Sequence, residues 1–165
     1  MLKKILSYFR SLAARLLELH DCPKALAGGV AIGIFIGFTP LFGVKTLLCL
    51  GAAYVLRCNP IAAVIAVTLH DVVAPFWPLL LEIEYAMGFR FLSYFHEVSV
   101  PAQLHEFHIR DMMQWTTFLG MGLPLLIGSL FLSIPAAIGS YAAMFPVFKR
   151  RAARRAARIV EPDSP

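Results

Sequence analysis

The chain has 165 residues, of which 59% are hydrophobic and 15% are charged, and its formal net charge is +5. Soluble globular domains average about 45–50% apolar and about 25% charged residues, so this composition argues against an ordinary soluble domain. A mean hydropathy of +0.72 instead predicts a single integral membrane domain, residues 1–165, of the all-α class.

Positive charge is concentrated near the two ends of the chain. The basic residues there are Lys3, Lys4, Arg10 and Arg15, then Lys149, Arg150, Arg151, Arg154, Arg155 and Arg158. Basic clusters that border apolar segments mark the cytoplasmic face of a membrane, so we expect both termini in the cytoplasm and an even number of full crossings. Beside so much apolar sequence we expect no nucleic-acid partner for the basic tail.

Residues 1–20 are predicted to form an amphipathic helix. Apolar side chains recur at spacings of three and four from Leu2 to Leu17, while Lys3 and Arg10 occupy the other face. Next to membrane segments, such a helix is expected to lie in the cytoplasmic interface beside anionic headgroups. The alternative is an ordinary surface helix packed on a soluble core.

Residues 23–96 contain apolar runs that are too short to cross a bilayer alone. The runs 25–38 and 44–56 flank a break that contains Pro40 and Gly43. Because a full crossing needs about 20 residues, the two runs predict a short, re-entrant helical hairpin whose tip is sheltered by protein.

A second broken unit is predicted farther along the same region. The apolar run 61–69 stops at His70 and Asp71, and Pro75 and Pro78 follow within an apolar stretch. This pattern predicts either a second half-membrane hairpin or a broken span. Two such units would form a pseudo-symmetric pair of the kind found in transporters.

The rest of the chain predicts an interfacial segment, a spanning helix and a tail. Residues 98–114 are polar and are expected at the far interface. Residues 115–148 carry no charge and predict a long membrane-spanning helix, bent at Pro124 and Pro135. It leads into a basic tail, residues 149–165, whose last residues are expected to be disordered.

Polar residues at the breaks between apolar runs are the candidate ligand-binding residues. They are Gly43, Lys45, Thr46, Arg57, Asn59, His70 and Asp71. Free backbone N–H groups at a broken helix attract anions, and Lys45 would add a positive charge, so a phosphate or lipid headgroup is the expected ligand. Ionisable groups at membrane depth are costly, so Asp71 or a glutamate would exchange a proton, unless His70 and Asp71 only cap a helix.

Three glycines predict a face for helix packing. Gly29, Gly33 and Gly37 stand four residues apart and form one flat stripe on a helix, which lets another backbone approach closely. The alternative is that this bare face receives a headgroup. Glu82 and Glu84 are two residues apart and do not share a helix face, and Arg90 and Arg57 are candidate partners for one of them.

No metal, cofactor or enzyme activity is predicted. His105 and His108 lie three residues apart beside Glu106 and Asp111, which can place two ligands on one helix face. Without a third strong ligand, a solvated interfacial face is favoured over a metal site. The cysteines, Cys22, Cys49 and Cys58, lack metal-site spacing and are expected to be free, and no catalytic constellation stands out.

The stretch from Pro23 to Asn59 resembles a bacterial family catalogued as domain of unknown function 2062. The matching residues are Pro23-x-x-x-Ala27, Gly29-x-Ala31-x-Gly33-x-Phe35-Ile36-Gly37-x-x-Pro40-x-x-Gly43-x-Lys45-Thr46 and Arg57-x-Asn59. The resemblance covers about residues 17–148 and implies a small inner-membrane protein. Some similar domains are joined to glycosyltransferases, which implies a place near lipid-linked sugar or envelope metabolism.

The chain departs from that family at two places. Members often carry glutamine where Lys45 stands. Members also often have an Asn-Pro pair, followed by threonine and proline, where this chain reads His70-Asp71-Val72-Val73-Ala74-Pro75.

Two functions follow from these observations. The first is an inner-membrane protein that binds or translocates an anionic or polyprenyl lipid headgroup, with membrane lipids as its partners. The second is a non-transporting scaffold or subunit that anchors an envelope-biosynthesis enzyme, such as a glycosyltransferase, through the glycine stripe. The expected protein partner is accordingly another membrane protein or a second copy of the chain. A polar cavity around Lys45 and Asp71 would favour the first, and a dry, tightly packed centre would favour the second.

Overall fold

The part of the chain that the structure describes, residues 2–39, 44–71, 77–95 and 122–160 of a computed structural model, is helical apart from short turns. This confirms the all-α class for these residues. The helices are α1 (Leu2–Glu18), α2 (Pro23–Phe38), α3 (Lys45–Val55), α4 (Pro60–Asp71), α5 (Trp77–Phe95) and α7 (Leu123–Val160).

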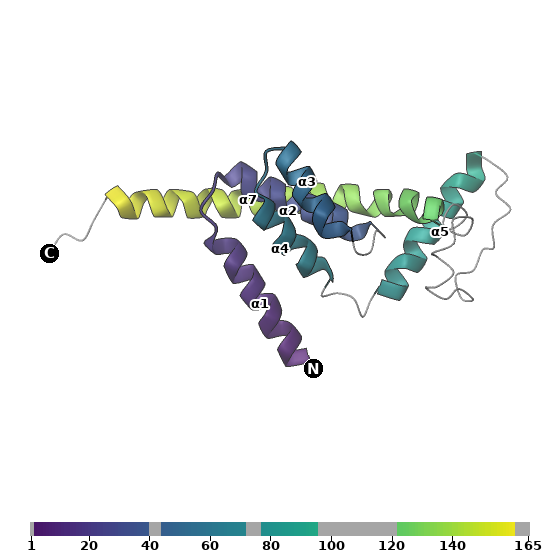
Figure 1. Cartoon of the computed structure of the whole chain (residues 1–165), viewed down its shortest axis with the longest axis horizontal. Helices are drawn as coiled ribbons and strands as arrows, with labels where there is room; N and C mark the ends of the chain where they lie inside the picture. The colour runs from purple at the N-terminus through teal and green to yellow at the C-terminus, as the bar shows by residue number, and fades with distance from the viewer. Residues whose placement is uncertain (1, 40–43, 72–76, 96–121, 161–165) are drawn as a thin grey trace.

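The longest helix, α7, runs along the long axis of the molecule (Figure 1). α2 packs along α7, and α5 packs against the N-terminal part of α7. The helix does not stop after Phe148 but continues through the basic residues to Val160. Pro124 lies in its first turn, where the missing N–H costs no hydrogen bond, whereas Pro135 and Pro146 lie inside the helix.

By length and composition, α7 is the one helix among the described residues that could cross a membrane. Its most apolar window has a mean hydropathy of 1.8, and only 28% of that window is buried inside the protein. The long apolar C-terminal helix predicted from the sequence is thus confirmed from Leu123 onward. Residues 115–121 of the predicted span lie outside the described residues.

The backbones of α2 and α4 touch because glycines line the contact. An added Cβ atom at Gly29 would collide with the carbonyl oxygen of Asn59, and one at Gly33 with that of Ala63. A Cβ atom at Gly37 would lie 2.7 Å from Cγ of His70. The order of these partners shows that α2 and α4 run parallel, with their C-terminal ends side by side. The glycine stripe predicted from the sequence therefore faces α4.

α3 packs on both α2 and α4. It runs antiparallel to them, from their C-terminal ends back toward their N-terminal ends. Small or slender buried side chains from the three helices meet there: Ile36, Cys49, Ala53, Ala63 and Val67. The two short helices expected on either side of the break are thus present as α2 and α3. The break itself, residues 40–43, lies outside the described residues.

The second broken unit does not form the hairpin considered above. α4 packs on α2, whereas α5 packs on α7, and the two helices lie in different parts of the molecule (Figure 1). The α5–α7 contact again uses glycine: a Cβ atom on Gly88 would collide with the carbonyl oxygen of Pro124, and one on Gly128 with that of Glu84. Matched small residues thus determine which helices pair, because they allow close backbone contact.

Gly33→Ala is expected to lower the free energy of unfolding by about 1–3 kcal/mol, because the new methyl group meets the α4 backbone, which cannot move aside easily. Gly51→Ala on α3 is the matched control. Nothing lies within 4 Å of its added Cβ atom, so it is expected to stabilise the helix by about 0.5–1 kcal/mol. Denaturant titration of the full chain in detergent, followed by circular dichroism, measures both. A Gly33→Ala protein as stable as Gly51→Ala would contradict the proposed contact.

Candidate functional site

Lys45, Asp71 and the end of α2 meet in a partly buried ionic cluster. The Lys45 ammonium donates a hydrogen bond of 2.7 Å to the carbonyl oxygen of Gly37 and lies 3.4 Å from Oδ1 of Asp71. The Lys45 side chain is only 8% exposed, and that of Asp71 is 41% exposed. A largely buried cation is therefore held by one carboxylate and one main-chain oxygen.

The direction of the helices explains why a cation belongs at this place. α2 and α4 are parallel, so the negative ends of their helix dipoles lie together, and Gly37 is among the last residues of α2 whose carbonyls lack a partner within the helix. Lys45 begins α3, where a cation is unfavourable for its own helix. Its tertiary contacts with the ends of α2 and α4 offset that cost.

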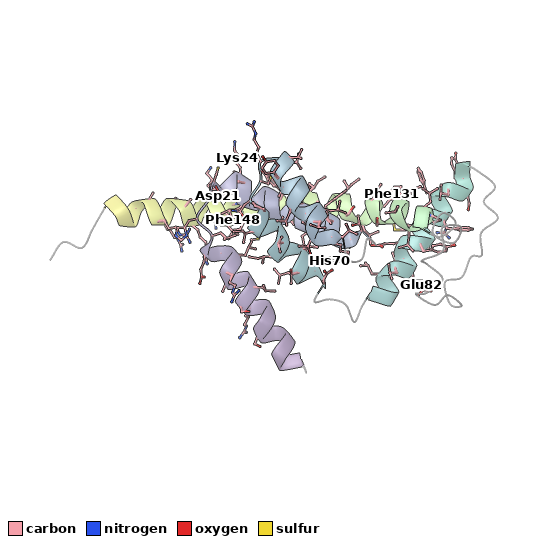
Figure 2. The ribbon with its side chains drawn as sticks, in the orientation of Figure 1. Asp21, Lys24, His70, Glu82, Phe131 and Phe148 are labelled. Carbon is pink, nitrogen blue, oxygen red and sulfur yellow. The ribbon has the colours of Figure 1, made fainter. Side chains whose placement is uncertain are left out.

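His70 closes one side of the cluster. Its ring centroid lies 4.6 Å from that of Phe38, and the ring covers the bare face of Gly37. Nδ1 lies 3.8 Å from Oδ1 of Asp71, which is beyond hydrogen-bond distance, and it has no hydrogen-bond partner in the described part of the chain. The His70 ring is thus packed between α2 and α4, and Figure 2 labels it near the end of α4.

The structure brings together only part of the expected ligand set. Lys45, His70 and Asp71 meet, and Thr46 is exposed on α3. Arg57 and Asn59 follow the opposite end of α3, an 11-residue helix about 16 Å long, so the expectation that they would join Lys45 is corrected. Gly43, the remaining candidate, lies outside the described residues.

Arg57 and Asn59 have structural roles at the α3–α4 turn. Arg57 is exposed and has a φ of 53°, the left-handed conformation that commonly ends a helix. Asn59 caps α4: its Oδ1 accepts the N–H of Ala62 at 2.8 Å, and its Nδ2 donates to Oδ2 of Asp21 at 3.0 Å. These side chains end one helix and begin the next.

Glu84 is a buried ionisable group whose position the sequence pattern did not reveal. It is 0% exposed, and neither carboxyl oxygen has a hydrogen-bond partner among the residues that the structure describes. Glu82 is exposed, and neither glutamate pairs with Arg90 or Arg57 in this part of the chain. Gly88 lies four residues after Glu84 and therefore on the same face of α5. This glycine was the sequence signal that this face packs against another helix, which is α7.

A second polar site lies at the basic end of α7. A cavity of about 520 Å³ is lined by Arg151, Arg154, Arg155 and Ala157. Two of these arginines also hold the end of α1. Arg151 donates to the carbonyl oxygen of Leu17 at 3.1 Å, and Arg155 donates to those of Leu17 and Leu19 at 3.2 and 3.1 Å.

These bonds satisfy main-chain carbonyls at the C-terminal end of α1, where cations are favourable. Phe148 is buried just before the arginines, together with Leu16 of α1 and Leu26 of α2, and Figure 2 shows it where α7 meets α1. The sequence predicts the basic cluster, but not that it binds α1.

The metal-site alternative falls where the structure gives no description. His105, Glu106, His108 and Asp111 all lie in residues 96–121, outside the described residues. Within the described ranges, no group of histidine, cysteine, aspartate or glutamate could hold a metal ion.

A family model described as "Uncharacterized protein conserved in bacteria (DUF2062)" matches residues 6–157. The chain belongs to this family. The match confirms the resemblance based on the glycine and proline pattern between Pro23 and Asn59. No curated protein and no solved structure matches the chain. Family membership thus places the chain in a family that is conserved in bacteria.

Lys45→Met and Asp71→Asn are each expected to lower the free energy of unfolding by about 1–3 kcal/mol, less than the roughly 3–5 kcal/mol for a fully buried pair, because Asp71 is partly exposed. The double variant should lose less than the sum, with a coupling of at least about 0.5 kcal/mol.

Lys24→Met combined with Asp71→Asn is the control for this cycle. Lys24 is exposed near the opposite end of α2, so its effect should add to that of Asp71→Asn. Denaturant titration in detergent measures the three single variants, Lys24→Met among them, and the two double variants. Additive effects for Lys45 and Asp71 would contradict the ion pair.

Proposed function

We propose that the protein is an integral protein of the bacterial inner membrane that binds anionic lipid headgroups at the basic end of α7. One observation carries this proposal. The apolar part of α7, whose surface is largely unburied, is followed along the same helix by the arginines that line the cavity. Apolar surface beside clustered guanidinium groups is the chemistry that a lipid tail and its phosphate would both find favourable.

The exposed side chains of α7 and α3 support insertion into lipid. Leu47 and Val55 of α3 are 68% and 76% exposed, and Ile138 of α7 is 65% exposed. In water, exposure of these apolar side chains would cost about 25 cal/mol of free energy per Å² of apolar surface. In hydrocarbon this cost is absent. Between Leu123 and Phe148, α7 rises about 38 Å, which is enough to cross a hydrocarbon core of about 30 Å with some tilt.

The short apolar helices α2, α3 and α4 would enter the lipid without crossing it. α2, the longest of these three, has 16 residues and is about 24 Å long. Its contacts with α4 and α7 would shelter the polar ends of these helices from hydrocarbon, as irregular backbone in a bilayer requires. The Lys45 cluster would lie at that sheltered end.

The basic end of α7 would face the cytoplasm. Positively charged residues next to a span favour that side of the membrane. Because Arg151 and Arg155 bind the C-terminal end of α1, the end of α1 would lie on the same side. This arrangement supports the interfacial position proposed for α1 from its sequence.

The arginine-lined cavity suits a phosphate better than the Lys45 cluster does. An anion at Lys45 would have to compete with Asp71 and with the carbonyl of Gly37. In the cavity, Arg154 is exposed and makes no side-chain hydrogen bond within the described part of the chain. One guanidinium group can donate two parallel hydrogen bonds to the oxygens of one phosphate group. Phospholipids and polyprenyl phosphates both carry a phosphate group.

A non-transporting scaffold is the second candidate function, and the packing of the centre favours it. α2 and α4 meet at glycines with no intervening space. Because the glycine stripe is covered by α4, it cannot be the docking face for another protein. A partner such as a membrane-bound glycosyltransferase would have to bind the exposed apolar face of α3 instead.

Arg154→Gln is expected to weaken binding of phosphatidylglycerol about five-fold, since one basic residue near a headgroup contributes about 1 kcal/mol. Native mass spectrometry of the full chain in detergent measures the dissociation constants. Arg150→Gln is the matched control, because Arg150 is exposed on the same helix but does not line the cavity.

Undecaprenyl phosphate and zwitterionic phosphatidylethanolamine complete the comparison. Tighter binding of undecaprenyl phosphate than of phosphatidylglycerol would identify a polyprenyl ligand. Equal binding of anionic and zwitterionic lipids, or equal effects of the two arginine substitutions, would contradict the proposed site.

A further inference from the structure

Glu84 lies at the place where α5 and α7 touch. Its own carbonyl group faces Gly128 of α7, and Gly88, one turn later, faces Pro124. The carboxyl group is enclosed there with no exposed surface. Tyr85 and Leu125 form the apolar core of the same contact.

We propose that Glu84 is a proton-binding site, which holds a proton in this conformation. The proposal goes beyond headgroup binding and does not depend on it. A carboxylate without hydrogen bonds in a closed apolar contact is far less stable than a neutral carboxylic acid. Ionisable groups in such positions commonly mark proton pathways.

Among the residues that the structure describes, the neighbouring groups leave the Glu84 carboxyl without a hydrogen-bond partner. On α7, Ser129 and Ser133 are buried, but each hydroxyl donates to its own helix, to the carbonyls of Leu126 and Leu130. Between Leu123 and Phe148 that helix contains no charged residue, and Tyr141 is its one titratable side chain. On α5, Glu82 is exposed on another face.

Infrared spectroscopy of the full chain in lipid tests the proposal. At pH 7 exposed carboxyl groups are ionised, since their pKa values lie near about 4. The wild type should nevertheless show the C=O stretch of a protonated carboxyl group, shifted in D2O. Glu84→Gln should lose this band, and Glu82→Gln, which changes the exposed neighbour, should keep it. Absence of the band from the wild type, or its survival in Glu84→Gln, would overturn the proposal.

Discussion

Direct backbone contact between α2 and α4 is the constraint on which the candidate site depends. Gly29 and Gly33 remove the side chains that would hold the helices apart, and the resulting parallel pair brings two helix C-termini together. Like ends of helix dipoles repel, so this end of the pair needs a cation. Lys45 supplies it, from a position at the start of α3 that local preference alone would not favour. The polar cluster is thus a consequence of the packing, and its ion pair has a structural reason that is independent of any ligand.

α7 connects this group to the rest of the molecule. Near its N-terminal end α7 contacts α5 at Gly128, and along its length it packs on α2. At its basic end, Arg151 and Arg155 donate hydrogen bonds to the C-terminal end of α1. These contacts use a minor part of its apolar surface, because 28% of the apolar window is buried. A helix that organises a soluble protein would bury most of that window. The unburied remainder supports the proposed insertion of this helix into lipid.

Much of the local structure could be predicted from the sequence, because it depends on short-range pattern. The glycine spacing indicated a packing face, the Pro23 to Asn59 pattern indicated the family, and the charge-free stretch indicated the long helix. Pairings between distant segments could not be predicted in this way. Gly88 and Gly128 determine that α5 pairs with α7, and nothing local to α4 excludes a hairpin with α5. For the same reason Asn59 was interpreted as a ligand although it is a helix cap, and Glu84 was not distinguished from Glu82.

Insertion of α7 into the lipid is the central claim, and a spin label at position 138 tests it most directly. Ile138 is 65% exposed and lies about 15 Å along the helix from Phe148, near the middle of a bilayer about 30 Å thick. The label would be placed by Ile138→Cys in a chain whose native cysteines are replaced, reconstituted in lipid, with Arg150→Cys as the control. The account predicts that oxygen, which concentrates in hydrocarbon, relaxes the label at 138 more than a water-soluble nickel chelate does, with the reverse order at 150. A label at 138 that is as accessible to the nickel chelate as the label at 150 would contradict insertion.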